Sequence, residues 1–426
     1  MNRNVIIIET HFIRLAWNKL RNAGLNRVFL VSLMLAGIIS LPLVLSSVTN
    51  SLTITSSGTI VSATALPLHI EGNQIEDSAG NNITLKGVDY ARWIDTPYGD
   101  WMLPDGSTEF GTWDPVAAQD TLAAMKSWGC NVVRLMFTTE WWVDNEGDFR
   151  TNIQTFISMA DALGIYVVLC PWRNNATGTE PSDLPWAPYD PNNNILNSST
   201  DFVNFWASVA SGLGNNSNVL FDLFNEPGGD EATWFSVVQS TINAIRAAGS
   251  TNIIVVEYGD GVGVDFAGFS LYDSGVRTGS IWTLDWITQN PLSDSDNNIL
   301  YSTHLYRSNF YDSSQGYIEI NSPNWINYTS NDLLWALNVT GVLNASRTYP
   351  LWIGEIGCSN WASDLTNEQT VYAATLSMLS NTTFGTDGYA GWDFWQTGEQ
   401  WGLVQAGAAG YQPSSAGQIL VNQLMS

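Results

Sequence analysis

The chain has 426 residues, of which 45% are hydrophobic, 12% aromatic and only 13% charged. This balance excludes a disordered or fibrous protein, because disorder requires low hydrophobicity and a high density of charge. Fifteen Lys and Arg residues against 40 Asp and Glu residues give a net charge of −25, which argues against binding of nucleic acid or anionic lipid. The 20 tryptophans favour an uncharged ligand that carries flat rings.

The N-terminal segment is predicted to be an export signal. Five basic residues lie in the first 27 positions, and an uncharged run of about 18 residues follows from Val28 to Leu45. This pattern predicts a signal peptide or a signal-anchor over residues 1–48, with membrane anchoring through residues 28–48 and the rest of the chain outside the cell. A buried core helix is the alternative, although such a helix seldom has basic residues on one flank only.

A Ser/Thr-rich linker over residues 49–66 is predicted to precede a folded domain over residues 67–426, since 11 of the 21 residues from 46 to 66 are Ser or Thr. Eight Asn-x-Ser/Thr sequons then support an exported glycoprotein, either secreted or tethered to the outer face of the cell membrane. The sequons begin at Asn82, Asn175, Asn197, Asn215, Asn327, Asn338, Asn344 and Asn381.

The part beyond residue 27 is even more acidic than the whole chain, with ten basic and 39 acidic residues and a net charge of −29. An acidic exterior would reduce this charge by protonating carboxylates, so we hypothesise that the protein works in an acidic medium. The three cysteines, Cys130, Cys170 and Cys358, cannot all pair within the chain, and we expect them to be buried free thiols.

Two short alternating runs at the start of the folded domain predict a β-hairpin around residues 77–82 that leads into a first strand. Eight short β-branched runs then alternate with amphipathic helical segments. The strands are predicted at 86–91, 131–137, 165–170, 219–224, 252–257, 299–304, 351–355 and 389–395. The helices are predicted at 115–128, 152–163, 201–213, 231–248, 367–379 and 414–425.

Strands that alternate with helices make a parallel sheet, and eight of them are the number that closes into a (β/α)8 TIM barrel. A doubly wound sheet is the alternative. The Gly-rich phosphate-binding loop expected in such a fold is missing, since the nearest candidate at residues 259–263 matches no fingerprint. The sequence therefore predicts an α/β barrel, in which functional residues collect at the C-terminal ends of the strands.

Two glutamates stand at such strand ends, Glu226 after the fourth strand and Glu355 in the seventh. A barrel brings both to one mouth, and a pair of carboxylates on either side of a bond is what glycoside hydrolysis needs. Two of 40 acids can also fall at strand ends by chance, but an unpaired charge in an apolar strand is costly. The pair therefore indicates a glycoside-hydrolase site.

Polar and aromatic residues near other strand ends complete the candidate site. Arg134 interrupts the apolar run NVVRLMF, so it needs a carboxylate partner and is expected to hold Glu355 ionised, although a structural salt bridge is the alternative. His304 and Tyr306 end the sixth strand and are expected near the nucleophile and the sugar. Tryptophans that are candidates for stacking on sugar rings, although tryptophan also fills cores, are Trp93, Trp141, Trp142, Trp172, Trp392 and Trp395.

These stretches together resemble family 5 of the glycoside hydrolases, which is rich in endoglucanases. Its members are (β/α)8 barrels that act with retention on β-linked polysaccharides. The similarity spans about residues 69–425, and the combination of LFNEP and IGEIG at strand ends is specific in its order and separation. The matching stretches are IEGNQIEDSAGNNITLKGV, CNVVRL, LFNEP, YSTHLY, WIGEIG and GWDFW.

The resemblance implies an exported, retaining endo-β-1,4-glucanase, with Glu226 as acid/base and Glu355 as nucleophile. It also implies that Asn225 hydrogen-bonds the sugar 2-hydroxyl and that Trp395 lies under the sugar. The residues implied to support the nucleophile are Arg134, His304 and Tyr306. Double displacement needs no metal or organic cofactor, and the sequence shows no His/Asp/Cys cluster at ligand spacing. We expect a monomer that acts on cellulose or a related glucan or mannan.

One departure from the family concerns the third strand, after which many members carry a histidine. This chain has Cys170, Pro171, Trp172 and Arg173 there, so Trp172 or Arg173 is a candidate replacement. Substrate preference is therefore open, and a β-mannanase, a xyloglucanase or a transglycosylase are alternatives. An inactive carbohydrate-binding envelope protein is an alternative of another class, although such a protein would not need the acid pair.

Overall fold

The computed structural model describes most of the chain from residue 64 onward. The described residues belong to one compact unit, Ser62–Ser426. They are 64–173, 196, 198–227, 231–257, 272–273, 276–277, 291–305, 311–312, 316–317, 349–362, 365–380 and 386–426. The predicted signal and the membrane segment at residues 28–48 lie outside these ranges. Within the described ranges, every helix is too short or too polar to cross a bilayer.

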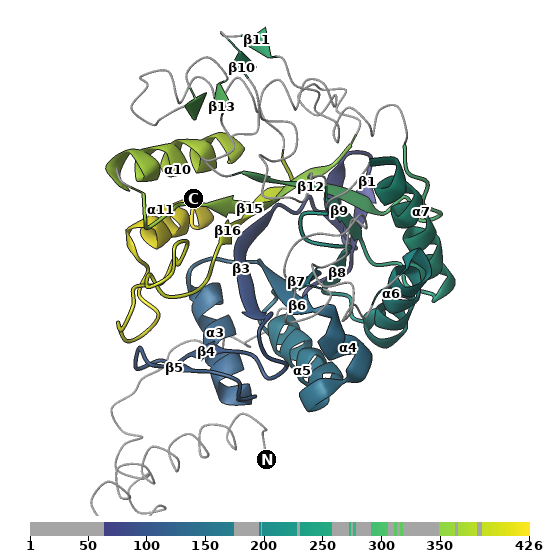
Figure 1. Ribbon diagram of the computed structural model, residues 1–426, viewed down its shortest axis with the longest axis horizontal. Coiled ribbons are helices and arrows are strands. Elements are labelled where there is room, and N and C mark those ends of the chain that lie inside the picture. Colours follow the sequence, from purple (N-terminus) through teal and green to yellow (C-terminus); the bar gives the residue numbers. More distant parts are fainter. Residues whose placement is uncertain are drawn as a thin grey trace, which may run out of the picture. The chain divides into compact units, whose positions relative to one another are not determined.

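Eight strands form a closed parallel barrel, which confirms the predicted fold class (Figure 1). Around the barrel the strands follow the order β12, β15, β16, β3, β6, β7, β8 and β9. Their bounds are β3 Leu85–Trp93, β6 Val132–Thr138, β7 Tyr166–Arg173, β8 Val219–Asp222, β9 Ile254–Glu257, β12 Ile299–Leu305, β15 Leu351–Gly357 and β16 Gly388–Trp392. Each predicted strand overlaps one of these, because long runs of buried β-branched residues suit a sheet that is covered on both faces.

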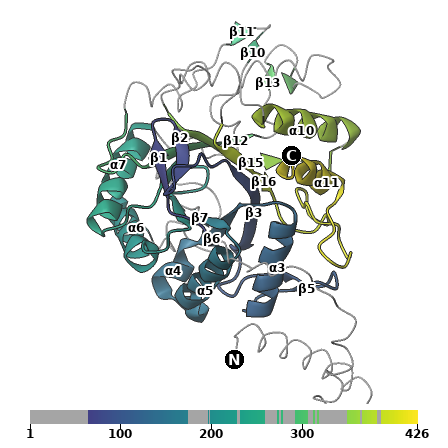
Figure 2. The same ribbon diagram turned by 180° about the vertical axis from the view of Figure 1, so that it is seen from behind.

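Helices surround the barrel on its outside (Figures 1 and 2). Their bounds are α3 Pro115–Ser127, α4 Thr139–Asp144, α5 Phe149–Ala162, α6 Ser199–Leu213, α7 Glu231–Ala247, α10 Leu365–Leu379 and α11 Ser415–Leu424, with a 3-10 turn η1 at Glu146–Asp148. Three helices begin at side-chain caps. Asp114 accepts hydrogen bonds from the backbone of α3, and Ser198 and Ser414 do the same for α6 and α11. Each of the six predicted helices overlaps one of these helices and is confirmed.

An antiparallel hairpin, β1 (Leu68–Glu71) with β2 (Gln74–Asp77), precedes the first barrel strand. Its tight turn lies at Gly72 and Asn73, earlier than predicted, because Gly72 supplies the positive φ of 64° that the turn requires. The predicted turn at residues 77–82 also exists and pairs Glu76 with Asn82. Ile75 of the hairpin packs with the first residues of the barrel strands, so the hairpin closes the N-terminal end of the barrel.

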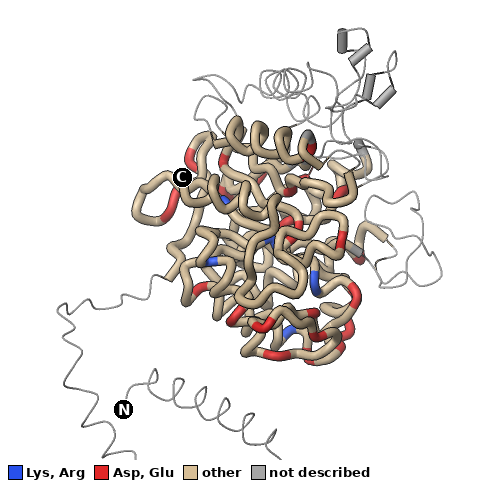
Figure 3. The backbone as a smooth tube through the Cα atoms, turned by 90° about the vertical axis from the view of Figure 1, so that its left-hand side faces the viewer, with Lys and Arg blue, Asp and Glu red and all other residues tan. Residues whose placement is uncertain are grey.

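Short two-stranded ribbons complete the structure: β4 Trp101–Met102 with β5 Thr108–Glu109, β10 Tyr272–Asp273 with β11 Val276–Arg277, and β13 Tyr311–Asp312 with β14 Gly316–Tyr317. Along the described backbone, acidic positions are spread widely and basic ones are few (Figure 3). The three cysteines are buried and free, as predicted.

Candidate functional site

The structure brings Glu226 and Glu355 together at the C-terminal end of the barrel. β8 ends at Asp222, and the chain reaches Glu226 four residues later. Glu355 lies in β15, directly opposite His304 of β12 in the strand pairing. One carboxylate oxygen of each glutamate and one ring nitrogen of His304 all lie within 4.8 Å of one another. The two carboxylates therefore share one small space although they lie 129 positions apart in the sequence.

The two glutamates differ in exposure. The Glu226 side chain is 29% exposed, whereas the Glu355 side chain is only 4% exposed. Water and a leaving group can therefore reach Glu226, whereas protein groups surround most of the Glu355 side chain. This asymmetry matches the different tasks of an acid/base, which exchanges protons with solvent, and a nucleophile, which must stay fixed.

Arg134 of β6 provides the positive charge beneath the pair and is fully buried. Its Nη1 donates to Glu355 Oε1 at 2.6 Å, as predicted, and to Asp89 Oδ1 at 3.1 Å. Its Nε donates to Asp222 Oδ2 at 2.8 Å, and its Nη2 donates to Glu257. One guanidinium thus faces four carboxyl groups, and burial is tolerable because all its nitrogens are hydrogen-bonded.

The sequence patterns did not identify three of these four acids as site residues, namely Asp89, Asp222 and Glu257. Burial raises the pKa of Asp89 well above its ordinary value, although Arg134 opposes the shift. Burial and the Glu257 carboxylate raise the pKa of Asp222 in the same way, so both aspartates hold their protons to a higher pH than an ordinary aspartic acid. Burial also acts to raise the pKa of Glu257, but His304 and Arg134 outweigh it and lower the pKa to about 2.

His304 carries the second positive charge of the site. It is 2% exposed, and its Nδ1 lies 3.0 Å from Glu226 Oε1 and 3.5 Å from Glu355 Oε2. Its Nε2 lies 3.2 Å from Glu257 Oε1. Burial acts to lower the pKa of His304, but Glu257, Glu355 and the hydrogen bond to Glu226 raise it well above its ordinary value. The ring is therefore an imidazolium that donates from both nitrogens.

Asn225 and Tyr306 are the remaining polar residues that the sequence placed at the site. Asn225 is 5% exposed, and its Oδ1 accepts a hydrogen bond from Arg134 Nη2 at 2.9 Å. This contact orients the amide and turns its nitrogen into the available donor. Tyr306 lies outside the described residues.

Two of the predicted tryptophans, Trp172 and Trp392, lie partly exposed near the acid pair. Their rings are 6.3 Å apart at an interplanar angle of 69°. Both pack against a small buried cluster that includes Met136 and Cys170, whose sulfur atoms lie 3.6 Å and 3.1 Å from Arg134 nitrogens. Trp172 lies at the end of β7, where Trp172 and Arg173 are the candidate replacements for the family's histidine. These two indoles are therefore placed to meet a ligand.

The structure corrects the expectation for Trp93 and Trp395, which are 0% and 1% exposed and offer no face to a sugar. Trp93 is enclosed by other core aromatic rings. Trp395 is covered by the Arg92 guanidinium, 4.4 Å from its ring centre, and by Phe110. The neighbouring Trp141 and Trp142 are also buried, so these four tryptophans belong to the core.

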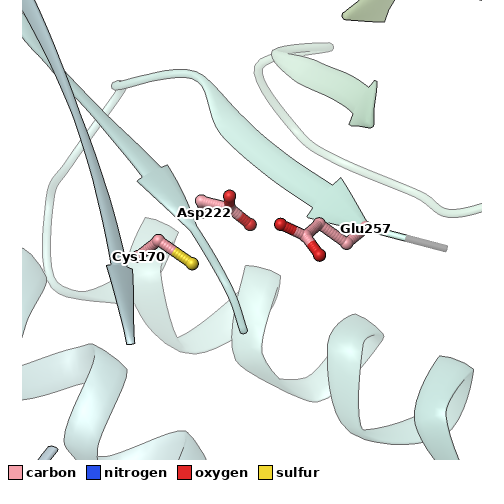
Figure 4. A group of neighbouring side chains, drawn as sticks. All are labelled: Cys170, Asp222 and Glu257. Atoms are coloured by element: carbon pink, nitrogen blue, oxygen red, sulfur yellow. The ribbon is translucent and has the colours of Figure 1, made fainter. Parts of the chain in front are cut away.

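Sequence spacing showed no cluster of metal ligands, yet strands far apart in sequence bring two such groups together. Glu226, His304 and Glu355 form one, and Cys170, Asp222 and Glu257 form the other. Figure 4 shows the Asp222 and Glu257 carboxyl groups facing each other, with the Cys170 sulfur nearby. The cation that this second group faces is Arg134, which hydrogen-bonds all three side chains. Burial raises the pKa of the Cys170 thiol well above its ordinary value, so the sulfur stays neutral there.

Comparison with known proteins agrees with this arrangement. The family model described as cellulase, glycosyl hydrolase family 5, matches residues 86–398, which include Arg134, Glu226, His304 and Glu355. The chain belongs to this family. The fold is shared as well: a β-glucanase from Saccharophagus degradans, solved in complex with cellotetraose, covers 88% of this chain and 98% of its own at a TM-score of 0.59 and 18% identity.

Curated relatives include endoglucanases and a mannanase. An endoglucanase of Thermobifida fusca is 25% identical over 70% of this chain and 49% of its own length. A mannan endo-1,4-beta-mannosidase of Cellvibrio japonicus is 22% identical over 78% of this chain and 60% of its own length. The chain spans about half the length of the curated endoglucanases that it matches, among them those of Neurospora crassa, Thermobifida fusca and Neosartorya fischeri.

Proposed function

We propose that this family 5 protein is a retaining endo-β-1,4-glucanase, with Glu226 as acid/base and Glu355 as nucleophile. The observation that carries the proposal is the pair of carboxylates with oxygens within 4.8 Å of one another, bridged by His304 at the barrel mouth. Retaining glycosidases hold their carboxyl groups about 5–5.5 Å apart, whereas inverting enzymes need about 6.5–9.5 Å to admit a water. The short separation therefore favours retention.

In the first step, Glu226 gives its proton to the glycosidic oxygen while a Glu355 oxygen attacks the anomeric carbon. The bond between that carbon and the leaving oxygen breaks, and a glycosyl-enzyme forms. Arg134 supports this step because its hydrogen bond at 2.6 Å keeps Glu355 an anion before attack. Asn225, oriented by Arg134, donates to the sugar 2-hydroxyl in this proposal.

In the second step, Glu226 is a carboxylate and takes a proton from the water that attacks the anomeric carbon. The ester bond to Glu355 breaks, and the sugar leaves with its original configuration. The 29% exposure of Glu226 supports this step, because the water must reach it from the open side of the site. Trp172 and Trp392 offer the apolar faces on which the sugar rings of the chain would stack.

A β-mannanase is the second candidate, and a specific observation favours keeping it. The mannosidase relative matches more of this chain than the T. fusca endoglucanase does, 78% against 70%. The departure from the family at the end of the third strand, where Trp172 or Arg173 is the candidate replacement for a histidine, also leaves the substrate preference open. A transglycosylase or xyloglucanase would use the same acid pair, and an inactive binding protein would have no use for it.

The proposal is tested by product analysis on cellulose, carboxymethylcellulose, xyloglucan and galactomannan at acidic and neutral pH. We expect soluble oligosaccharides from the β-glucans with retained configuration at the new reducing end. Glu355→Gln should abolish turnover with folding intact, while Glu71→Gln, an exposed carboxylate at the closed end of the barrel, should match the wild type. Hydrolysis by Glu355→Gln at the wild-type rate would refute the assignment, and faster cleavage of galactomannan would favour the mannanase.

The location of the protein is part of the same proposal. We propose that residues 1–48 direct export and that the barrel works outside the cell as a glycosylated monomer, secreted or tethered through residues 28–48. The basic leader and the uncharged run support export. The Asn82 and Asn215 sequons are exposed, as glycosylation requires. Fractionation of cells, with glycosidase treatment of the product, tests this location.

A further inference from the structure

Glu257 is a buried carboxylate in the centre of the site that the two-step reaction does not use. It is the last residue of β9, it is 2% exposed, and its carboxylate oxygens are occupied by hydrogen bonds to protein groups. On the basis of the function proposed above, we infer that Glu257 is the positioning residue that holds the acid/base Glu226 in place, through its backbone and through His304.

The first hold is on the backbone of Glu226. Glu257 Oε2 accepts a hydrogen bond from the Glu226 backbone N–H at 2.7 Å. Glu226 has a φ of 45°, a left-handed backbone conformation that residues other than glycine rarely adopt. A charge-assisted hydrogen bond to the N–H of the same residue stabilises this conformation, which aims the Glu226 side chain into the site.

The second hold runs through the imidazolium of His304. Glu257 Oε1 lies 3.2 Å from Nε2, and Nδ1 on the other side of the ring lies 3.0 Å from Glu226 Oε1. Glu257 thus fixes the ring that contacts the acid/base carboxyl. Facing the ring are Glu226 from the β8 loop, Glu257 from β9 and Glu355 from β15, with the buried Asp89 of β3 farther off.

Glu257 must be ionised for both holds, and its other neighbours keep it so. Arg134 Nη2 donates to Glu257 Oε1. The Asp222 carboxyl group faces that of Glu257 (Figure 4). Burial and Glu257 raise the pKa of Asp222, whereas the burial of Glu257 is outweighed by His304 and Arg134, which lower its pKa, so Glu257 is the member of the pair that keeps its negative charge. The carboxylate therefore connects the arginine that holds Glu355 to the histidine that holds Glu226.

Glu257→Gln discriminates a positioning carboxylate from a space-filling side chain. It keeps the shape but removes the charge, and its amide NH2 group would face either the donors of Arg134 and His304 or the Glu226 backbone N–H. We expect kcat on cello-oligosaccharides to fall about 10²-fold with KM within about threefold. Glu257→Asp keeps the charge but shortens the reach to the Glu226 N–H, so it should lower kcat without neutralising His304.

The decisive readout is the titration of His304 by NMR, which is tractable because the chain has only three histidines. In the wild type the ring should stay protonated well above its ordinary pKa of 6.5. In Glu257→Gln the midpoint should fall by at least about one unit, because one of the anions that face the ring is gone. In Glu257→Asp the His304 midpoint should stay close to that of the wild type. This second variant keeps the test available even if Glu257→Gln does not fold.

A matched control is Glu368→Gln, another buried glutamate that accepts a backbone N–H, from Ser359 at 2.9 Å. It should leave kcat and the His304 titration unchanged. Wild-type kcat and an unshifted His304 titration in Glu257→Gln would overturn the inference, as would a His304 midpoint in Glu257→Asp that falls by a full unit. Glu226→Gln separates this failure from failure of the proposed function, because full activity in that variant would remove Glu226 as the acid/base.

Discussion

At the scale of single residues, the site is a balance of buried charges rather than a pair of glutamates alone. Arg134 and His304 are cations, and Glu257 and Glu355 are the anions that face them most directly. Burial raises the pKa of Asp89 and Asp222, so these two carboxyl groups keep their protons to a higher pH than ordinary aspartates. Glu226 is the one carboxylate of the group that reaches open space, which fits a group that must gain and lose a proton in each cycle.

Replacing Glu226 by alanine should separate the two steps of the reaction. We expect kcat/KM on cello-oligosaccharides to fall about 10²- to 10⁴-fold, because the leaving oxygen needs a proton. An aryl cellobioside with a good leaving group should still form the glycosyl-enzyme, and added azide should restore turnover and yield the β-glycosyl azide. In Glu355→Ala, azide should instead yield the α-anomer by direct displacement. The same anomer from both variants would contradict the roles assigned to the two glutamates.

At the scale of elements, the pairing of β12 with β15 sets His304 opposite Glu355. The approach of the two strands is close at Gly354, where an added Cβ would lie 2.5 Å from Ser302 Oγ and 3.1 Å from His304 Nε2. Gly354, the first glycine of IGEIG, is therefore needed because a larger residue would collide with Ser302 and His304, independently of the chemistry of Glu355.

Gly354→Ala should lower kcat by about 10²-fold, because displacement of His304 by a fraction of an ångström to an ångström misplaces both glutamates. It should also destabilise the fold by about 1–3 kcal/mol through overpacking. Gly398→Ala is the control, since its added Cβ would meet nothing within 4 Å. Kinetics and thermal unfolding of the two variants measure the effect, and wild-type kcat in Gly354→Ala would contradict the packing argument.

The strands were predictable because each is an apolar run that the barrel buries on both faces, and Glu226 and Glu355 were predictable from their motifs. Asp89, Asp222 and Glu257 were missed, although the argument that singled out Arg134, a charge inside an apolar strand, applies equally to them. The exposure of the tryptophans was not predictable. Trp395 is covered by Arg92 and Phe110, from segments about 300 positions away, whereas Trp172 is partly open.

At the scale of the whole molecule, charge and pH act together. At pH 7 the net charge of −25 means that the many carboxylates repel one another. The magnitude of this charge decreases as the solution becomes acidic. The site adds a pH dependence of its own, because several of its groups hold protons differently in the folded and unfolded chain. Both effects bear on the hypothesis that the protein works in an acidic medium.

The sign follows from each group. Glu257 has a folded pKa of about 2 against an ordinary 4.5, so its contribution is present above pH 4.5 and is lost as the pH falls toward 2. The folded pKa of His304 is raised above 6.5, so its contribution is present below 6.5 and is lost as the pH rises through the folded value. Asp89 and Asp222, raised above 3.8, also cost stability as the pH rises.

The free energy of unfolding should therefore be largest near pH 3.8–4.5, where most of the Glu257 contribution is present and Asp89 and Asp222 have only begun to cost stability. It should be smaller at about pH 8, as chemical denaturation at each pH would show. Asp222→Asn tests the cause, because an asparagine can accept from Arg134 Nε and donate to Glu257 as the neutral acid does. This variant should match the wild type near pH 3.8 and be more stable than it at pH 8, by about 1.4 kcal/mol for each unit of pKa shift that it removes. A wild-type stability that rises steadily from pH 5 to pH 8 would contradict both the buried neutral aspartates and the protonated His304, and with them the structural support for an acidic medium.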